Sequence, residues 1–441
     1  MPDGPAPRGR GVSGTELNSG RIAYLLTAFP TVSETFVEGE FRALARRGLP
    51  VDLYATRNFR EETAADEPGR DRGLTIQRSA YLFGSEVPAA VFYFLARHPG
   101  RTLGTFARIV AGNIRSPRYL AHAVALFPKS LVFARKMRAL GTAHVHGTWA
   151  HYPATAAYIA ARLLGTSYSF SGHAGLDVFS NAAFLPRKIH EARFILACQS
   201  ATRRRMEQLV PGSSGKIHVV YHGVDFGEIP RPGSVQRANP PEIVSVGRLT
   251  PEKGFLDLLQ AAALLRDRGV PFRLRIFGSG PQREELKRES ARLELGNVVR
   301  LEGIAPHREV LAAMAGATLV ALASYRTPND FQDGIANVLV EAMACGTTVV
   351  TTDYDGSREL LESGRYGVTV PERDPARLAE AIEVLLRDPD RRRELAQAAR
   401  ERVERDFDRD RNVETIARLF RETLPAAGAP APRAASGPAG A

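Results

Sequence analysis

The strongest constraint on the fold is an alternation of short, apolar, β-rich runs with helical patterns, which occurs twice along the chain. Parallel strands buried on both faces have this composition, and the helices between them supply the crossovers. The runs cover residues 21–28, 51–56, 143–147, 167–171, 194–198 and 217–221, and then 242–247, 273–277, 298–302, 318–323, 347–352 and 367–370. A polar, proline-rich stretch at 229–241 separates the two series. The pattern predicts two doubly wound, Rossmann-like α/β domains joined by a linker.

Domain boundaries follow from the same pattern. We expect an N-terminal domain over 20–230, a linker over 231–241, a C-terminal domain over 242–407, and disordered ends over 1–19 and 424–441. Residues 408–423 carry an apolar stripe and are expected to form a helix that packs back on the N-terminal domain. Ligands of open parallel sheets bind beyond the carboxyl ends of the strands, so the cleft between the domains is the expected site.

Local signals place several helices. Thr31–Glu34 is a capping box, and Val37, Phe41 and Leu44 form the apolar stripe of a helix that ends at Gly48. A second helix is expected over 336–345, stopped by a glycine. Residues 374–406 are expected to form two helices interrupted at a proline.

Composition excludes several classes of protein. The chain has 441 residues, of which 44% are hydrophobic, which is ordinary globular usage. Its apolar runs are far shorter than the roughly 20 residues that cross a membrane. Two cysteines make no disulfide framework, and the first 20 residues have no apolar signal region. We therefore expect a cytoplasmic protein.

Positive charge is unevenly distributed along the chain, which carries a formal net charge of +11. Residues 85–140 contain nine arginines or lysines against one acid, Glu86, and include the apolar run Val91–Leu95. Two interpretations remain open: a solvated basic face, or a surface for anionic headgroups at the inner face of the plasma membrane. No recognition helix, zinc spacing or aromatic-flanked basic ribbon indicates binding to nucleic acid.

Two cations follow the strand expected at 242–247. Arg248 and Lys253 lie five residues apart in a loop that ends at Gly254. An arginine fork and a lysine point charge at one strand end could grip a diphosphate and neutralise it as it leaves, without a metal. Taken alone, a loop with these residues is more often merely solvated.

Glycines and acids add two further signals. Gly278 and Gly280 follow the strand expected at 273–277, in a turn that could admit a phosphate or nucleoside, although this is no nicotinamide fingerprint. Asp333 and Glu341 lie eight apart across a loop-to-helix junction. A carboxylate accepts two hydroxyls at once, which suits a ribose or sugar diol, and amides at a helix start favour an anion. The alternative is a turn aspartate and an unrelated helical glutamate.

In this order and spacing, the elements resemble the family-4 glycosyltransferases, two-domain enzymes of the GT-B architecture. The resemblance extends over about residues 20–422 and is closest to the branch that builds bacterial exopolysaccharides. The matching segments are Phe29-Pro30 with Ser33-Glu34-Thr35-Phe36, His173 in SGHAG, His222-Gly223-Val224-Asp225, Gly247-Arg248 with Lys253-Gly254, Gly278 and Gly280, and Glu341 through Gly346.

The resemblance implies an activity and a set of roles. Family members transfer a sugar from a nucleotide-sugar, with retention of configuration and without a metal, to a glycan, lipid-linked or small-molecule acceptor. Arg248 and Lys253 would bind the donor diphosphate, and Glu341 would bind the ribose. Asp333 would contact the donor sugar, and His173 would lie beside that sugar and the acceptor. The donor site would also include Gly247, Gly278, Gly280, Gly334 and Ile335.

The chain departs from the family pattern at one acid. Most members have glutamate where this chain has Asp333, and proline where it has Ala336. A shorter carboxylate retracts its oxygens by about 1.5 Å, so the loop has moved, the sugar is presented differently, or Asp333 only shapes the turn. We expect a retained contact, because the spacing to Glu341 is kept.

Alternatives to the transferase remain at this point. A sugar-nucleotide epimerase or hydrolase could use the same fold, and a non-catalytic relative would lack Arg248 or Lys253, which are both present. No cofactor or metal is expected. His144, His146 and His151 have no partner at zinc-ligand spacing, and Asp353 and Asp355 form the acidic pair that binds metal in a different glycosyltransferase architecture.

Overall fold

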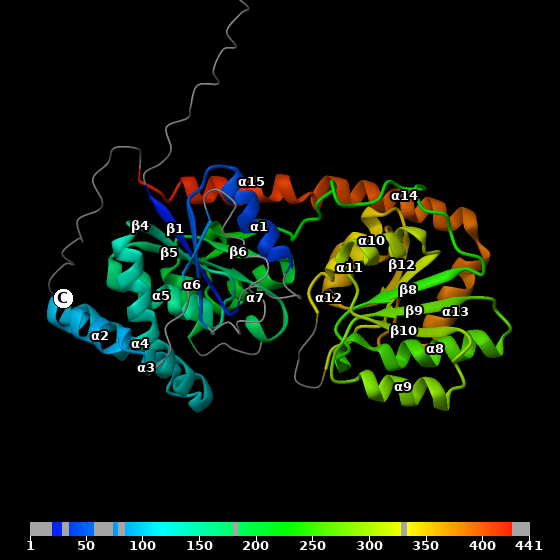
Figure 1. The fold of residues 1–441 in the computed structure, drawn as a ribbon, viewed down its shortest axis with the longest axis horizontal. Helices are drawn as coiled ribbons and strands as arrows, with labels where there is room; N and C mark the ends of the chain where they lie inside the picture. Colours follow the sequence, from blue (N-terminus) through cyan, green and yellow to red (C-terminus); the bar gives the residue numbers. More distant parts are fainter. Residues whose placement is uncertain are drawn as a thin grey trace, which may run out of the picture.

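The computed structural model describes residues 20–28, 35–56, 74–77, 84–179, 184–327 and 333–425. Two α/β domains lie side by side, each built on one parallel sheet with helices on its faces (Figure 1). The expected two-domain α/β fold is therefore confirmed. The expected disordered ends and the capping box at Thr31–Glu34 lie outside the described residues.

The N-terminal domain contains a seven-stranded sheet in the order β3-β2-β1-β4-β5-β6-β7. Its strands are β1 (Arg21–Leu26), β2 (Val51–Ala55), β3 (Leu74–Gln77), β4 (Thr142–Gly147), β5 (Ser167–Gly172), β6 (Ile195–Ala197) and β7 (Ile217–Val219). Six of these coincide with the predicted apolar runs. The edge strand β3 was not predicted, because its four residues, LTIQ, are too few and too polar to stand out.

Seven helices cover the N-terminal sheet or extend from it in the described part of the chain. They are α1 (Thr35–Arg46), α2 (Glu86–Arg97), α3 (Pro99–Asn113), α4 (Pro117–Ala139), α5 (Tyr152–Leu164), α6 (Leu185–Glu191) and α7 (Ser200–Leu209). Val37, Phe41 and Leu44 are buried on the inner face of α1, as their spacing predicted. Helix α2 lies at the end of the molecule farthest from the other domain, and α3 continues from it along the lower edge of the N-terminal domain (Figure 1).

The C-terminal domain contains a six-stranded parallel sheet in the order β10-β9-β8-β11-β12-β13. Its strands are β8 (Glu242–Val246), β9 (Arg273–Phe277), β10 (Val299–Gly303), β11 (Leu319–Leu322), β12 (Thr348–Thr352) and β13 (Val368–Val370). Its helices are α8 (Phe255–Asp267), α9 (Arg283–Arg292), α10 (His307–Gly316), α11 (Asn337–Ala344), α12 (Asp355–Leu361), α13 (Pro375–Arg387) and α14 (Pro389–Asp406). Gly346, at φ +74°, follows α11 in the left-handed conformation that a helix stop requires.

The last helix of the described residues, α15 (Arg409–Arg421), returns to the N-terminal domain. Helices α14 and α15 run end to end along one side of both domains (Figure 1). Val413, Ile416 and Phe420 are buried in one apolar cluster with residues of α1, β1 and β2. The first strands of the chain and its last helix therefore share a core.

The chain crosses between the domains twice, and the two crossings lie side by side. Val224 pairs with the second crossing through its N–H to the carbonyl of Phe407, at 2.9 Å, and through its carbonyl to the N–H of Arg409, at 3.1 Å. Asp225 forms an ion pair with Arg409. A Cβ on Gly223 would lie 2.4 Å from the backbone of Arg409, so only glycine fits between the crossings.

Two histidines of β4 form a polar ladder with serines of β5 inside this shared core. His144 bonds to Ser167 and Ser169, at 2.8 and 2.7 Å, and His146 bonds to Ser169 and Ser171, at 2.7 and 3.0 Å. Both imidazoles are fully buried. Burial lowers the pKa of His144 to about 3 and that of His146 well below its usual value, so both rings are neutral.

Candidate active site

A cavity of about 330 Å³ lies between the two domains. The N-terminal domain contributes Phe36, Trp149, His173, Ala174, Cys198 and His222, and the C-terminal side contributes Arg248, Lys253, Asp333, Gly334, Ile335, Ala336, Asn337 and Phe407. The carboxyl ends of β4, β5 and β8 point to it. Six of the predicted site residues thus line one cavity: His173, Arg248, Lys253, Asp333, Gly334 and Ile335.

Lys253 and Asp333 form an ion pair within the cavity. Lys253 Nζ lies 2.6 Å from Asp333 Oδ2, and both side chains are mostly buried. The hydroxyl of Ser324 donates to the same carboxylate oxygen, at 3.0 Å. Arg248 is more loosely held: it is largely exposed and lies 3.5 Å from Glu252. An exposed guanidinium can reorient toward a ligand at little cost, whereas the lysine is already fixed in place.

Glycines allow the loops beneath the cations to pack closely. Gly254 adopts φ +65°, and a Cβ there would lie 1.8 Å from the carbonyl oxygen of Ala323. A Cβ on Gly278 would lie 1.9 Å from the carbonyl oxygen of Gly247, and one on Gly280 would lie 2.4 Å from that of Leu249. Gly247, Gly278 and Gly280 do not line the cavity. These glycines let two strand-end loops touch each other, so their spacing is explained without a direct ligand contact.

The start of α11 forms the cavity wall where the domains meet. A Cβ on Gly334 would lie 3.0 Å from the Cβ of Ala174 in the opposite domain. The next three residues also line the cavity, and the helix begins at Asn337. The first N–H groups of a helix have no partner within the helix and carry partial positive charge. This wall can therefore hold an anionic group beside Lys253.

His173 is held by two hydrogen bonds through its ring. Nε2 lies 2.8 Å from the carbonyl oxygen of Thr148, and Nδ1 lies 3.1 Å from Nε2 of His222. A carbonyl only accepts, so Nε2 of His173 carries the proton and Nδ1 accepts from His222. Burial lowers the pKa of His173, which keeps the ring neutral. Both ring nitrogens are therefore occupied, so a substrate reaches this histidine only through its ring face, its backbone or a rearrangement.

Two buried charges that sequence reasoning missed hold the loop around His173. Asp177 accepts backbone N–H groups of Ala150, His151 and His173, each at 2.9 Å. Lys188 donates to the carbonyls of Ala150 and His151. Burial lowers the pKa of Lys188 to about 8. The signal that could have found Asp177 is its place four residues after the histidine, in SGHAGLD.

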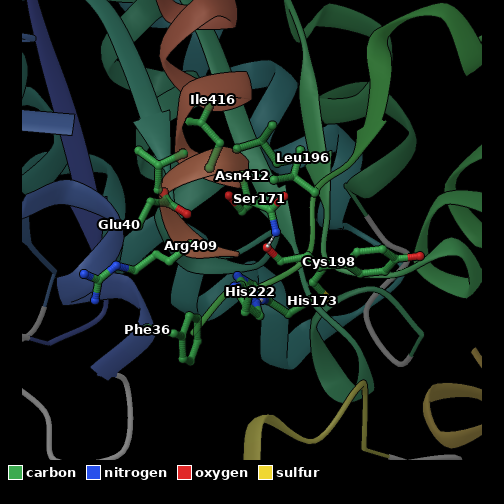
Figure 2. A pocket seen from close by; sticks show the side chains of 14 residues that line it. Phe36, Glu40, Ser171, His173, Leu196, Cys198, His222, Arg409, Asn412 and Ile416 are labelled. Carbon is green, nitrogen blue, oxygen red and sulfur yellow. Dashed lines mark hydrogen bonds between the residues drawn. The ribbon is translucent and has the colours of Figure 1, made fainter. Parts of the chain in front are cut away.

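Aromatic rings surround the two histidines. Phe36 lies 4.1 Å from His222 and Trp149 lies 4.0 Å from His173, measured between ring centroids. Behind them, a small cavity of about 20 Å³ is closed by Asn412 and Ile416 from α15 (Figure 2). Phe36, His173, Cys198 and His222 line both this small cavity and the main one, so the two adjoin.

One group of side chains in the described part of the chain could hold a metal ion. Ligand atoms of His173, Cys198 and His222 lie within 4.8 Å of one another. Burial raises the pKa of the Cys198 thiol to about 12, so this sulfur is protonated. The two imidazoles face each other in a hydrogen bond. The expected absence of a metal stays a prediction.

Glu341 faces a second cavity, of about 400 Å³, which also lies between the domains. His307 Nε2 lies 3.1 Å from Glu341 Oε1, and His307 Nδ1 lies 3.7 Å from Glu228 Oε2. The adjacent carboxylates raise the pKa of His307, with Glu341 the main cause. Sequence reasoning missed His307, because a histidine 34 residues from Glu341 forms no spacing motif.

The other residues considered as metal ligands have different partners. Arg358 pairs with Asp353, at 2.8 Å, and with Asp355, at 3.4 Å. The imidazole of His151 accepts the N–H of Tyr152, at 2.6 Å, and caps α5. His144 and His146 belong to the ladder described above.

Comparison with known proteins gives a family match over the C-terminal domain and a similar protein over most of the chain. Residues 229–402 match the sequence model of the family described as glycosyl transferases group 1. Across 413 residues the chain is 28% identical to a protein of Escherichia coli K12 named as a colanic acid biosynthesis glycosyltransferase, WcaL, covering 88% of this chain and 96% of that protein.

Solved structures share the fold. Sucrose-phosphate synthase from Thermosynechococcus elongatus superimposes with a TM-score of 0.70 at 18% identity, over 91% of this chain and 98% of that one. Alr3699/HepE of Anabaena, solved in complex with UDP-glucose, superimposes with a TM-score of 0.65 at 18% identity, over 91% and 99%.

The two parallel-sheet domains that face one cleft have the two-domain GT-B fold of these solved structures. Residues 229–402, most of the C-terminal domain, match the family glycosyl transferases group 1, and over most of its length the chain is similar to a protein named as a glycosyltransferase.

Proposed function

We propose that this enzyme transfers a sugar from a nucleoside-diphosphate sugar to a growing exopolysaccharide precursor, with retention of configuration and without a metal. One observation carries the proposal: Arg248, Lys253, Asp333 and the start of α11 meet at a single cavity, opposite His173 of the other domain. The E. coli relative is named for colanic acid biosynthesis, which favours a polysaccharide product. A structural neighbour was solved with UDP-glucose, which favours a nucleotide-sugar donor.

Each element has a role in this reaction. Arg248 and Lys253 hold the diphosphate and offset the charge that develops as it leaves the sugar. The amides at the start of α11 supply further positive potential. Asp333 orients the ammonium of Lys253 and accepts a hydroxyl of the donor sugar. Phe36 and Trp149, on the N-terminal side, face the acceptor.

The positions of the charges support the proposed metal independence. Two cations at the diphosphate replace the charge that a divalent ion supplies in other transferases. Asp353 and Asp355 already neutralise Arg358. Activity is therefore expected to survive EDTA, and a strict requirement for added metal would contradict this part of the proposal.

A donor screen tests the function. The melting temperature is measured with UDP, GDP, ADP and dTDP sugars, because a ligand that binds only the folded state raises stability by mass action. The stabilising donor is then supplied with a cell-envelope glycan acceptor, and the anomeric configuration of the product is read by NMR. Hydrolysis or epimerisation of the donor without transfer would favour a sugar-nucleotide hydrolase or epimerase. An inverted product would contradict retention.

The finer proposal on location is that α2 and α3 attach the enzyme to an anionic membrane. In the described ranges, seven of the nine exposed large hydrophobic side chains lie between residues 92 and 140, among them Phe92, Leu103 and Ile114. Phe92 is 75% exposed, whereas Phe94 is buried. No acid occurs from Val87 to Leu140. Apolar anchors among cations suit a bilayer interface.

The structure corrects the count of surface cations. Lys129 is buried, and it donates to the carbonyl of Thr56 at 2.5 Å, while Lys136 pairs with Glu86. Among the described residues, no helix is both long and apolar enough to span a membrane. Attachment would therefore be peripheral, and the acceptor would be a lipid-linked glycan.

Vesicle co-sedimentation tests this location. Binding is expected to require anionic lipid and to weaken with salt, and the variant Phe92→Ser with Leu103→Ser should reduce it. Val384→Ser, an exposed apolar residue of α13 in the other domain, is the matched control. Binding that ignores lipid charge, or that falls equally in the control, would contradict the proposal.

A further inference from the structure

An imidazole is held between two carboxylates in the second cavity, and the roles assigned above leave it unused. His307 begins α10, Glu341 projects from α11, and Glu228 follows the first domain crossing. The distances are 3.1 Å from Nε2 to Glu341 and 3.7 Å from Nδ1 to Glu228. Three segments of the chain thus converge on one ring.

The charge state of His307 matters to both neighbours. A neutral imidazole has one N–H, so it can donate to one carboxylate while its other nitrogen presents a lone pair to the second. The imidazolium donates on both sides and is favoured by both negative charges. The other charged groups lining this cavity are Glu38, Arg42 and Arg46 of α1, and the ion pair of Asp225 with Arg409.

We propose that His307 is a positioning residue for the donor nucleotide: it holds one oxygen of Glu341, so that the other oxygen is presented to the ribose hydroxyls. The proposal rests on the proposed function, because it requires Glu341 to contact the ribose. Protonated His307 also offsets carboxylate charge that faces an anionic nucleotide. Nucleotide affinity is therefore greatest when the ring is charged, and it falls as the pH rises and the ring loses its proton.

Nucleotide binding measured against pH tests the proposal. The dissociation constant of the nucleoside diphosphate that stabilises the enzyme most, among UDP, GDP, ADP and dTDP, is determined by calorimetry from pH 6.5 to 9. The proteins are the wild type, His307→Gln, His307→Ala and the control His190→Gln, an exposed histidine of α6. The nucleotide's own ionisation, titrated without protein, is common to all four proteins and is subtracted from each profile, while the control shows the effect of replacing a histidine elsewhere.

The expected results separate positioning from a general structural role. The wild type and the control should bind about 3- to 10-fold more weakly at pH 9 than at pH 6.5. His307→Gln keeps an N–H donor without a titrating group, so its profile should be flat and its affinity within about threefold of the wild type at pH 9. His307→Ala should bind about 10-fold more weakly at pH 6.5, also with a flat profile. At saturating donor, kcat should change by less than about twofold in each variant.

Two outcomes would overturn the proposal in distinguishable ways. If Glu341→Ala weakens the nucleotide but His307→Ala binds it like the wild type, or keeps its pH profile, the inference about His307 fails and the proposed function stands. If Glu341→Ala itself binds the nucleotide normally, the ribose role of Glu341 fails and the role of His307 fails with it. Matching melting temperatures of the variants would show that each is folded.

Discussion

At the scale of single residues, the ion pair of Lys253 with Asp333 explains how an aspartate can stand where a longer acid is usual. The Asp333 oxygen that lies 2.6 Å from Lys253 Nζ also accepts the hydroxyl of Ser324. The carboxylate is therefore held beside the loop that contains Lys253. A shorter side chain that reaches the lysine can act on the sugar and on the diphosphate together.

This pairing predicts that Asp333→Asn lowers turnover without weakening nucleotide binding. Removing the acid should lower kcat by about 10- to 100-fold, because the lysine loses its orientation and the sugar loses a contact. The Kd of the nucleoside diphosphate should not rise, because Lys253 keeps its charge and loses a competing anion. Steady-state kinetics and calorimetry measure the two. Ser324→Ala removes the other bond to the same oxygen and should lower kcat by less than about tenfold. Equal activity of Asp333→Asn and the wild type would reduce Asp333 to a turn-forming residue.

At the scale of elements, the ladder between β4 and β5 places titratable groups inside a core. The unfolded chain takes up protons on its histidines below pH 6.5 or so, whereas buried His144 and His146 stay neutral. Below that pH the unfolded state binds more protons, so stability decreases as the pH falls, by about 1.4 kcal/mol per pH unit for each such group.

The free energy of unfolding is therefore expected to fall as the pH is lowered from 7 to 5. His144→Gln should reduce this slope by about 1.4 kcal/mol per pH unit, which is the contribution of one proton. His190→Gln, at an exposed position, should leave the slope unchanged. The free energy of unfolding from urea titrations at several pH values measures both. Parallel pH profiles for His144→Gln and the wild type would show that the ladder does not set the acid sensitivity.

At the scale of the whole molecule, α15 makes the N-terminal domain depend on the end of the chain. Phe420 is fully buried and packs on Tyr24, His144, His146 and Phe194, with ring centroids 5.4 to 5.7 Å apart. Phe420→Ala should cost about 3 to 5 kcal/mol. Hydrogen exchange should show lost protection in β1, β2 and β4, with β8 to β12 unaffected. Leu395→Ala, in α14 and the C-terminal core, should reduce protection in β8 to β12 and leave β1, β2 and β4 unaffected. Equal loss of protection in both domains would contradict a core that α15 shares with the N-terminal domain alone.

Much of this arrangement is encoded locally and could be predicted. Buried parallel strands leave apolar runs, so twelve strands are visible in the sequence, whereas the short edge strand β3 is not. The strand-end cations could be placed because the loop follows its strand directly. The pairing of Lys253 with Asp333, 80 residues away, and that of His307 with Glu341 depend on how separate loops meet. The exposure of Phe92 depends on where α2 lies, which an apolar run alone does not specify.

The shared core has a consequence for biosynthesis. The apolar residues of α1, β1 and β2 leave the ribosome early, but the helix that covers them begins at Arg409, some 350 residues later. At a synthesis rate of about 5 to 20 residues per second, this apolar surface stays uncovered for roughly 20 to 70 seconds before α15 is made. During that interval the nascent chain carries an unfinished first domain while the second completes its own sheet. The enzyme should therefore depend on chaperones during synthesis more than a protein whose first domain can fold completely before the second is synthesised.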